Sequence, residues 1–112
     1  MKNFLKAGLI ELDAKNKYQR LLSEEAGTRG IKSGHVILEA GENIGEHSTE
    51  NREEVVVILK GRGEAKIGKR GILKIRRNAV LYVPPQTIHD IKNTGSKVLE
   101  YIFITSPANR LL

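Results

Sequence analysis

The sequence contains no cysteine and no tryptophan among its 112 residues. Without cysteine the chain forms no disulfide and offers no thiolate to a metal ion, so a metal must be bound by histidine, aspartate or glutamate. Long hydrophobic runs are also missing, and none approaches the length of a membrane span. The apolar residues of the first segment are interrupted by Lys6, Gly8 and Glu11, a pattern too weak for a secretory signal. We therefore expect a cytoplasmic protein without a membrane partner.

The length of the chain suits one hydrophobic core and is too short for two, so we expect residues 1–112 to form a single domain. Short runs rich in valine, isoleucine, leucine and tyrosine follow one another, separated by glycine, proline, asparagine and serine, which is typical of strands. These runs are 18–22, 35–40, 54–60, 64–67, 72–75, 80–83, 88–91 and 98–105. They predict an all-β fold, an antiparallel sandwich or barrel, with a hairpin turn at 68–71. Segment 3–12 is predicted to be either a helix or a further strand.

Two of the predicted strands are apolar on both faces. Side chains alternate between the faces of a strand, and in 54–60 and 98–105 both alternating sets consist mostly of valine, isoleucine, leucine and aromatic residues. A chain of this size has too few elements of its own to cover both faces. A second subunit is the simplest cover, so we expect a homodimer.

The net charge of +6 is unevenly distributed. Segment 60–77 holds eight lysines and arginines against the single acid Glu64, and segment 39–54 holds six glutamates against Arg52. A basic segment of this kind favours contact with phosphates, but this one contains no aromatic residue for base stacking. We therefore interpret it as a solvated face, and do not expect nucleic acid to be the main partner.

Two histidines and a glutamate stand at regular distances from glycines, a proline and an asparagine. Two imidazoles and one carboxylate placed on strands form a facial triad, a ligand set suited to Fe(II) and similar ions with open coordination positions. The spaced residues are Gly41, His47, Glu54, Gly61, Pro84, His89 and Asn93.

This spacing resembles the two motifs of the cupin superfamily over 41–93, about half of the chain. The resemblance implies a jelly-roll antiparallel β-barrel that holds a divalent metal ion inside. Three positions depart from the motifs. Thr49 stands where the second histidine of the first motif would be, and Asn78 and Gln86 replace the two glycines of the second motif.

Carried over from the resemblance, the metal ligands would be His47, Glu54 and His89. Glu54 is assigned rather than Glu53 because it has the six-residue interval to Gly61, and the neighbouring residue of a strand points to the opposite face. Three ligands suffice for a catalytic ion, although we expect weaker affinity than with four. The residue types do not distinguish Fe, Mn, Ni, Zn and Cu. The alternative is a hydrogen-bonded polar cluster without any metal.

Two further residues are candidates for the pocket. Thr49 would leave its coordination position to water or substrate, because a hydroxyl is a poor ligand at neutral pH. His35 begins a predicted strand and would line the pocket, or else serve as a surface or packing residue.

Two functions follow from this pattern. The first is a metal-dependent small-molecule enzyme of the oxygenase or the isomerase or lyase type. The second is a non-catalytic barrel that binds a small ligand or a metal as a sensor or store, with or without an ion. The sequence names no substrate, because one barrel supports unrelated functions.

Overall fold

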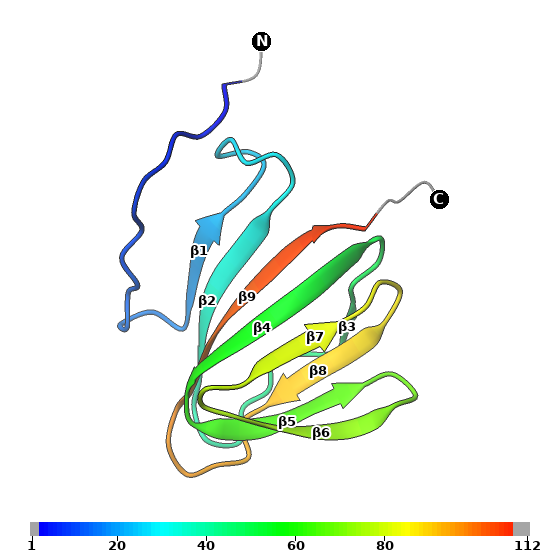
Figure 1. The fold of residues 1–112 in the computed structure, drawn as a ribbon. Helices are drawn as coiled ribbons and strands as arrows, with labels where there is room; N and C mark the ends of the chain where they lie inside the picture. Colours follow the sequence, from blue (N-terminus) through cyan, green and yellow to red (C-terminus); the bar gives the residue numbers. More distant parts are fainter. Residues whose placement is uncertain (1–2, 109–112) are drawn as a thin grey trace.

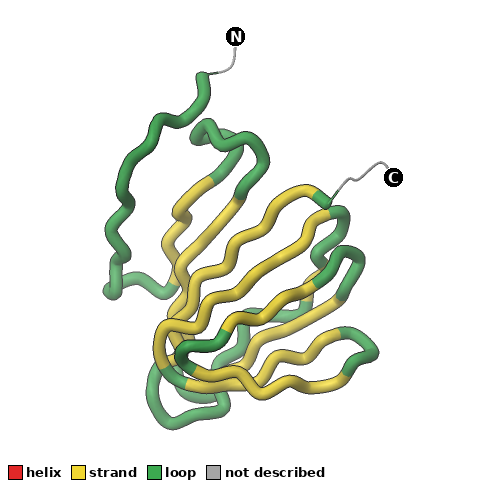
Figure 2. The backbone as a smooth tube through the Cα atoms, in the orientation of Figure 1, coloured by secondary structure: helices red, strands yellow, loops and turns green. Residues whose placement is uncertain are grey.

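The computed structural model describes residues 3–108, and these residues form nine strands and no helix (Figures 1 and 2). None of the described residues belongs to a helix that could cross a membrane. The strands are β1 (Tyr18–Leu22), β2 (Lys32–Leu38), β3 (His47–Ser48), β4 (Arg52–Lys60), β5 (Arg62–Ile67), β6 (Gly71–Arg76), β7 (Val80–Val83), β8 (Ile88–Lys92) and β9 (Leu99–Pro107).

The strands are arranged in two antiparallel sheets, with the order β1-β2-β9-β4-β7 in one and β3-β8-β5-β6 in the other. Alternate side chains of each sheet point toward the other sheet, and the core forms between them, with Val56, Ile58, Leu99 and Tyr101 at most 2% exposed. Strands that are distant in the sequence lie side by side, as β4 does beside β9 (Figure 1). This arrangement confirms the predicted all-β jelly-roll fold.

All eight predicted strands are present, two of them, β1 and β7, with the predicted ends and the others with shifted ends, and the hairpin between β5 and β6 is where the glycines predicted it. Strand β3 was not predicted, because it is only two residues long and too short to show alternation. Segment 3–12 is neither the helix nor the strand that we predicted. Its backbone is held to the rest of the chain by the bonds from the Leu5 amide to the Gly27 carbonyl and from the Gln19 side-chain amide to the Glu11 carbonyl, and Leu9 is 99% exposed. Without a sheet or a core to pack against, its apolar residues do not impose regular structure.

Backbone conformation shows why Gly61 of the first motif must be glycine, and what backbone Asn78 and Gln86 adopt where the second motif has glycine. Gly61 has φ of 82°, and a Cβ there would lie 2.3 Å from the carbonyl oxygen of Val98. Asn78 and Gln86 adopt φ of 68° and 54°, a region that glycine enters freely and other residues enter at a cost. The chain therefore keeps the glycine-type backbone at both positions without the glycine.

Candidate metal centre

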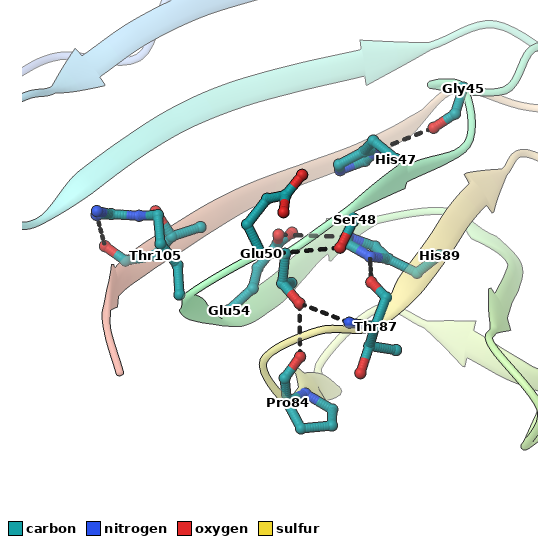
Figure 3. Close-up of polar contacts among 11 residues, drawn as sticks. Gly45, His47, Ser48, Glu50, Glu54, Pro84, Thr87, His89 and Thr105 are labelled. Atoms are coloured by element: carbon teal, nitrogen blue, oxygen red, sulfur yellow. Dashed lines mark hydrogen bonds and ion pairs between the residues drawn. The ribbon is translucent and has the colours of Figure 1, made fainter. Parts of the chain in front are cut away.

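Three strands bring the predicted ligands together. His47 on β3 and His89 on β8 are directly paired within the four-stranded sheet, and Glu54 reaches them from β4 in the facing sheet. Each of the three offers one ligand atom, and these atoms all lie within 4.8 Å of one another. Figure 3 shows the three side chains converging between the two sheets.

Backbone carbonyls fix the orientation of both imidazoles. The Nδ1 of His47 lies 2.8 Å from the carbonyl oxygen of Gly45, and the Nδ1 of His89 lies 3.0 Å from that of Thr87 (Figure 3). A carbonyl oxygen only accepts, so each Nδ1 carries the proton and donates it. The Nε2 of each neutral ring is then free to bind a metal, the arrangement in which a second contact holds a ligating histidine in place.

The Nε2 of His89 is an orphaned buried atom. It is buried and makes no hydrogen bond among the described residues, and it lies 3.4 Å from Oε1 of Glu54. Buried polar atoms are normally satisfied, so such a group indicates a missing partner. A spacing of 3.4 Å also suits two ligands that share one ion at bond lengths of about 2 Å. The donor set therefore fits a divalent metal.

The same contact sets the protonation of His89 when no metal is bound. Burial, the largest influence, lowers the pKa of the imidazole, but the Glu54 carboxylate and the Thr87 carbonyl outweigh it, so the pKa of His89 is raised. The metal-free protein thus favours an ion pair between His89 and Glu54. Metal and proton compete for the same nitrogen.

The two adjacent glutamates of β4 are separated by strand alternation. Glu54 points inward and is 7% exposed, whereas Glu53 points away and its Oε1 accepts a hydrogen bond of 2.9 Å from the hydroxyl of Tyr82. The structure therefore places the glutamate selected from the motif at the site, and its neighbour outside it.

Thr49 has a structural role in place of the missing histidine. Its hydroxyl donates to the carbonyl oxygen of Pro84 at 2.7 Å and accepts from the amide of Thr87 at 3.1 Å. These bonds connect the end of β3 to the loop that leads into β8. The side chain that replaces a ligand thereby holds the segment that carries His89.

The site opens into a cavity of about 330 Å³, a size suited to a small molecule. Its walls include Tyr18, Tyr101 and Phe103, together with His47, Glu54 and Thr49. Burial raises the pKa of Tyr101, so its phenol stays protonated at neutral pH.

Arg52 lines the same cavity, and the sequence analysis missed it. Its Nε donates to the hydroxyl of Thr105 at 2.9 Å, and Nη2 donates to the carbonyl oxygens of Gly30 and Thr105. Nη1 lies 3.8 Å from Oε1 of Glu24. The guanidinium is thus held as a fixed positive charge in the cavity wall. The available signal was its position two residues before Glu54, on the same face of one strand.

His35 does not line the cavity, which corrects the pocket role expected for it. It lies on β2 between inward-facing neighbours, so its side chain is on the outer face of the five-stranded sheet. It is fully buried there, with Nε2 at 2.6 Å from Oε2 of Glu100. The Glu100 carboxylate satisfies Nε2, whereas Nδ1 is buried without a hydrogen-bond partner among the described residues. Of the two alternatives stated for His35, the packing role is the one observed.

The chain matches the family model described as Cupin domain over residues 34–105, well over half of its length. No curated protein sequence matches it. Solved structures that resemble it include a protein of Thermotoga maritima described as a predicted oxalate decarboxylase. The two are 26% identical, with 80% of this chain and 78% of the other covered and a TM-score of 0.74.

Two further structures share the fold at lower identity. An RmlC-like cupin family protein of Methanocaldococcus jannaschii is 20% identical, with 93% and 94% of the two chains covered and a TM-score of 0.78. A cupin 2 conserved barrel domain protein of Salinispora arenicola is 19% identical, with 92% and 91% covered and a TM-score of 0.76. These likenesses concern the fold.

Proposed function

Because the chain belongs to the cupin family, as its match over residues 34–105 shows, we propose that it is a divalent-metal-dependent enzyme acting on a small molecule inside the barrel. The observation that carries this proposal is the convergence of His47, Glu54 and His89, with a buried Nε2 that has no hydrogen-bond partner among residues 3–108. Fe, Mn, Ni, Zn and Cu are all compatible with two imidazoles and one carboxylate.

A bound ion would supply Lewis-acid chemistry at a substrate oxygen, either for oxygen chemistry or for isomerisation or bond cleavage beside a carbonyl. The residues of the chain orient the substrate. The protonated phenol of Tyr101 would donate a hydrogen bond to the substrate, and Tyr18 and Phe103 would pack against its apolar part. No carboxylate other than Glu54 lines the cavity in the described part of the chain. With three protein ligands, positions remain open for substrate.

Arg52 favours a substrate that carries a carboxylate. Its charge is permanent, and the guanidinium is fixed by Thr105 and Gly30 within the wall of the cavity. The Thermotoga maritima protein, whose description names a small dicarboxylate, supports the same class. We propose a small carboxylic acid as substrate.

The second candidate is the non-catalytic barrel, a sensor or store for the same class of ligand. It is favoured by the cavity lining, which among the described residues offers no carboxylate or imidazole beyond the metal ligands to act as a general base. The two functions differ in outcome. An enzyme converts a carboxylic acid to a product that chromatography detects, whereas a binding barrel is only stabilised by it.

Elemental analysis of untagged protein tests the metal. We expect about one divalent ion per chain in the wild type, and loss of it in His47→Ala, His89→Ala and Glu54→Gln. Glu53→Gln is the matched control, since it makes the same change one residue away on the opposite face and should keep the ion. No ion after reconstitution with each metal, or equal loss in both glutamate variants, would refute the site.

We further propose that the protein is a homodimer, joined through the outer face of the five-stranded sheet. Exposed apolar side chains gather on this face, with Val80 66%, Tyr82 53% and Ile104 38% exposed. Beside the edge strand β1, segment 3–12 exposes Phe4, Leu5, Leu9, Ile10 and Leu12 as well. A patch of this kind marks a site of association.

The charges of β4 favour a second copy as the partner. On the outer face Glu53 stands near the start of β4 and Lys60 at its end, with valines between them. A two-fold axis across the strand reverses its direction, so Glu53 of one copy meets Lys60 of the other. The face is thus complementary to itself.

A cytoplasmic location also remains a prediction.

A further inference from the structure

A groove of about 400 Å³ lies at the end of the barrel away from the metal centre, and its walls are basic. Glu54 and His89 stand near the starts of β4 and β8, whereas the groove is formed just beyond the ends of the same two strands. Figure 1 shows the β4–β5 connection and the orange loop before β9 at this end of the molecule. The basic groove is lined by Gly61, Arg62, Arg76, Arg77, Gly95, Ser96 and Lys97.

Like charges face each other across two strands in this groove. Arg62 on β5 and Arg76 on β6 are directly paired, a position where two charges of one sign repel and destabilise a sheet. The other basic residues of the same outer face have acids in register. Lys74 and Lys92 both pair with Glu64, and Lys66 pairs with Asp90.

The basic groove contains no acid. None of the ion pairs found among residues 3–108 includes Arg62, Arg76, Arg77 or Lys97. Four cations therefore surround one hollow, two of them in direct opposition, without a carboxylate to neutralise them. A negatively charged ligand would remove this repulsion and bind tightly for the same reason.

Hydrogen bonds hold the walls of the groove in place. The amide of Arg77 donates to the carbonyl of Gly61 at 3.0 Å, which fixes the β6–β7 turn against the β4–β5 connection. Asn93 orders the opposite wall. Its side chain donates to the carbonyl of Lys97 at 2.8 Å and accepts from the amide of Gly95 at 2.9 Å.

The side chain of Arg62 lies against Gly95, where an added Cβ would be 3.2 Å from its Cγ. The cations thus project from ordered backbone, so binding a ligand orders their side chains without also having to order the main chain.

We propose that this basic groove binds a small phosphorylated molecule through a phosphate or diphosphate group. Arginine guanidinium groups match phosphate oxygens in a bidentate manner, and three of the four cations are arginines. The volume suits a small molecule, and the absence of an aromatic side chain from the lining disfavours stacking on nucleic-acid bases. This site is separate from the metal centre.

Titration calorimetry with inorganic pyrophosphate at constant ionic strength tests the proposal. We expect saturable binding that Arg62→Gln and Arg76→Gln each weaken about ten-fold or more. Lys69→Gln is the control, because it removes one charge from the β5–β6 turn outside the basic groove, and it should change the affinity less than two-fold. His89→Ala should bind as the wild type does, which separates this site from coordination at the metal centre.

Thermal melting provides a second readout that a general charge effect would not reproduce. Without pyrophosphate, Arg76→Gln should raise the melting temperature by roughly 1–4 °C, because it removes the repulsion with Arg62. With pyrophosphate at a concentration far above the wild-type Kd the order should reverse, since the wild type binds the ligand more tightly and gains more stability from it. The proposal would be overturned if pyrophosphate did not bind, if Lys69→Gln weakened binding equally, or if His89→Ala lost it. It would also be overturned if the protein bound a single-stranded oligonucleotide but not pyrophosphate.

Discussion

His47 and His89 are directly paired across β3 and β8, and their ring centroids lie 4.2 Å apart. Each ring donates from Nδ1 to a carbonyl two residues earlier in the chain, just before its strand, that of Gly45 or Thr87. The two imidazoles are therefore positioned by local backbone within one sheet. The third ligand, Glu54, belongs to the other sheet, so the complete site depends on how the sheets pack.

The pH dependence of stability in the metal-free protein follows from the raised pKa of His89. Burial opposes the imidazolium, but Glu54 and the Thr87 carbonyl outweigh it, so the pKa when folded exceeds the value of about 6.5 expected when unfolded. The ion pair with Glu54 then stabilises the fold fully below about pH 6.5 and ceases to do so as the pH rises through the raised pKa. We expect the difference in melting temperature between wild type and Glu54→Gln to be larger at pH 6 than at pH 9. A difference that grows with pH would contradict this assignment.

Metal occupancy should show the opposite trend. Binding requires neutral imidazoles, so the metal content should fall as the pH drops below the raised pKa of His89. Dialysis against a fixed metal concentration at a series of pH values, followed by elemental analysis, measures it. Constant metal content down to about pH 5 would show that the histidines are not the principal ligands.

Replacing Thr49 tests its role as the connector of two segments. Thr49→Val keeps the shape but leaves the carbonyl of Pro84 and the amide of Thr87 without their partner, so we expect a loss of about 1–3 kcal/mol in the free energy of unfolding. Thr49→Ser retains the hydroxyl and should lose less. Urea denaturation monitored by circular dichroism distinguishes them. Equal stability of the two variants would contradict the role of the hydroxyl.

Glycine at position 86 should stabilise the protein. Gln86 has φ of 54°, which costs an L-residue roughly 1–2 kcal/mol, while glycine adds about 0.5–1 kcal/mol of entropy loss on folding. We expect Gln86→Gly to gain about 0.5 kcal/mol in denaturant unfolding. The amide of Gln86, which donates to the carbonyl of Glu50 at 2.8 Å, is unchanged by the substitution. Gln86→Ala is the control, because alanine still pays the conformational cost of a positive φ. If alanine raised the free energy of unfolding as much as glycine does, the conformational explanation would be refuted.

The proposed dimer is tested by two isoleucines on opposite sheets. Light scattering should give about twice the chain mass of 12.5 kDa for the wild type. Ile104→Glu should give a monomer, because it places a charge on the outer face of the five-stranded sheet. Ile72→Glu makes the same change at a site that is 61% exposed on the other sheet, and should remain dimeric. A monomeric wild type, or equal disruption by both variants, would refute this interface.

The sequence by itself determined eight of the nine strands of the described residues, the fold class and the three residues that converge. Alternation and turn residues are local properties, and the regular intervals from Gly41 to Asn93 carried the resemblance. The choice of Glu54 over Glu53 also followed from the sequence, because a strand turns successive side chains to opposite faces.

Tertiary structure alone decided the rest, since it depends on residues that are distant in the chain. His35 lies on the outer face of β2 and is buried there beside Glu100, a residue 65 positions later in the chain that sheet pairing brings to it. Segment 3–12 lacked regular structure because no sheet edge pairs with it. Arg52 joined the cavity, and Arg62 met Arg76, through strand register and sheet packing, which side-chain pattern within one segment does not specify.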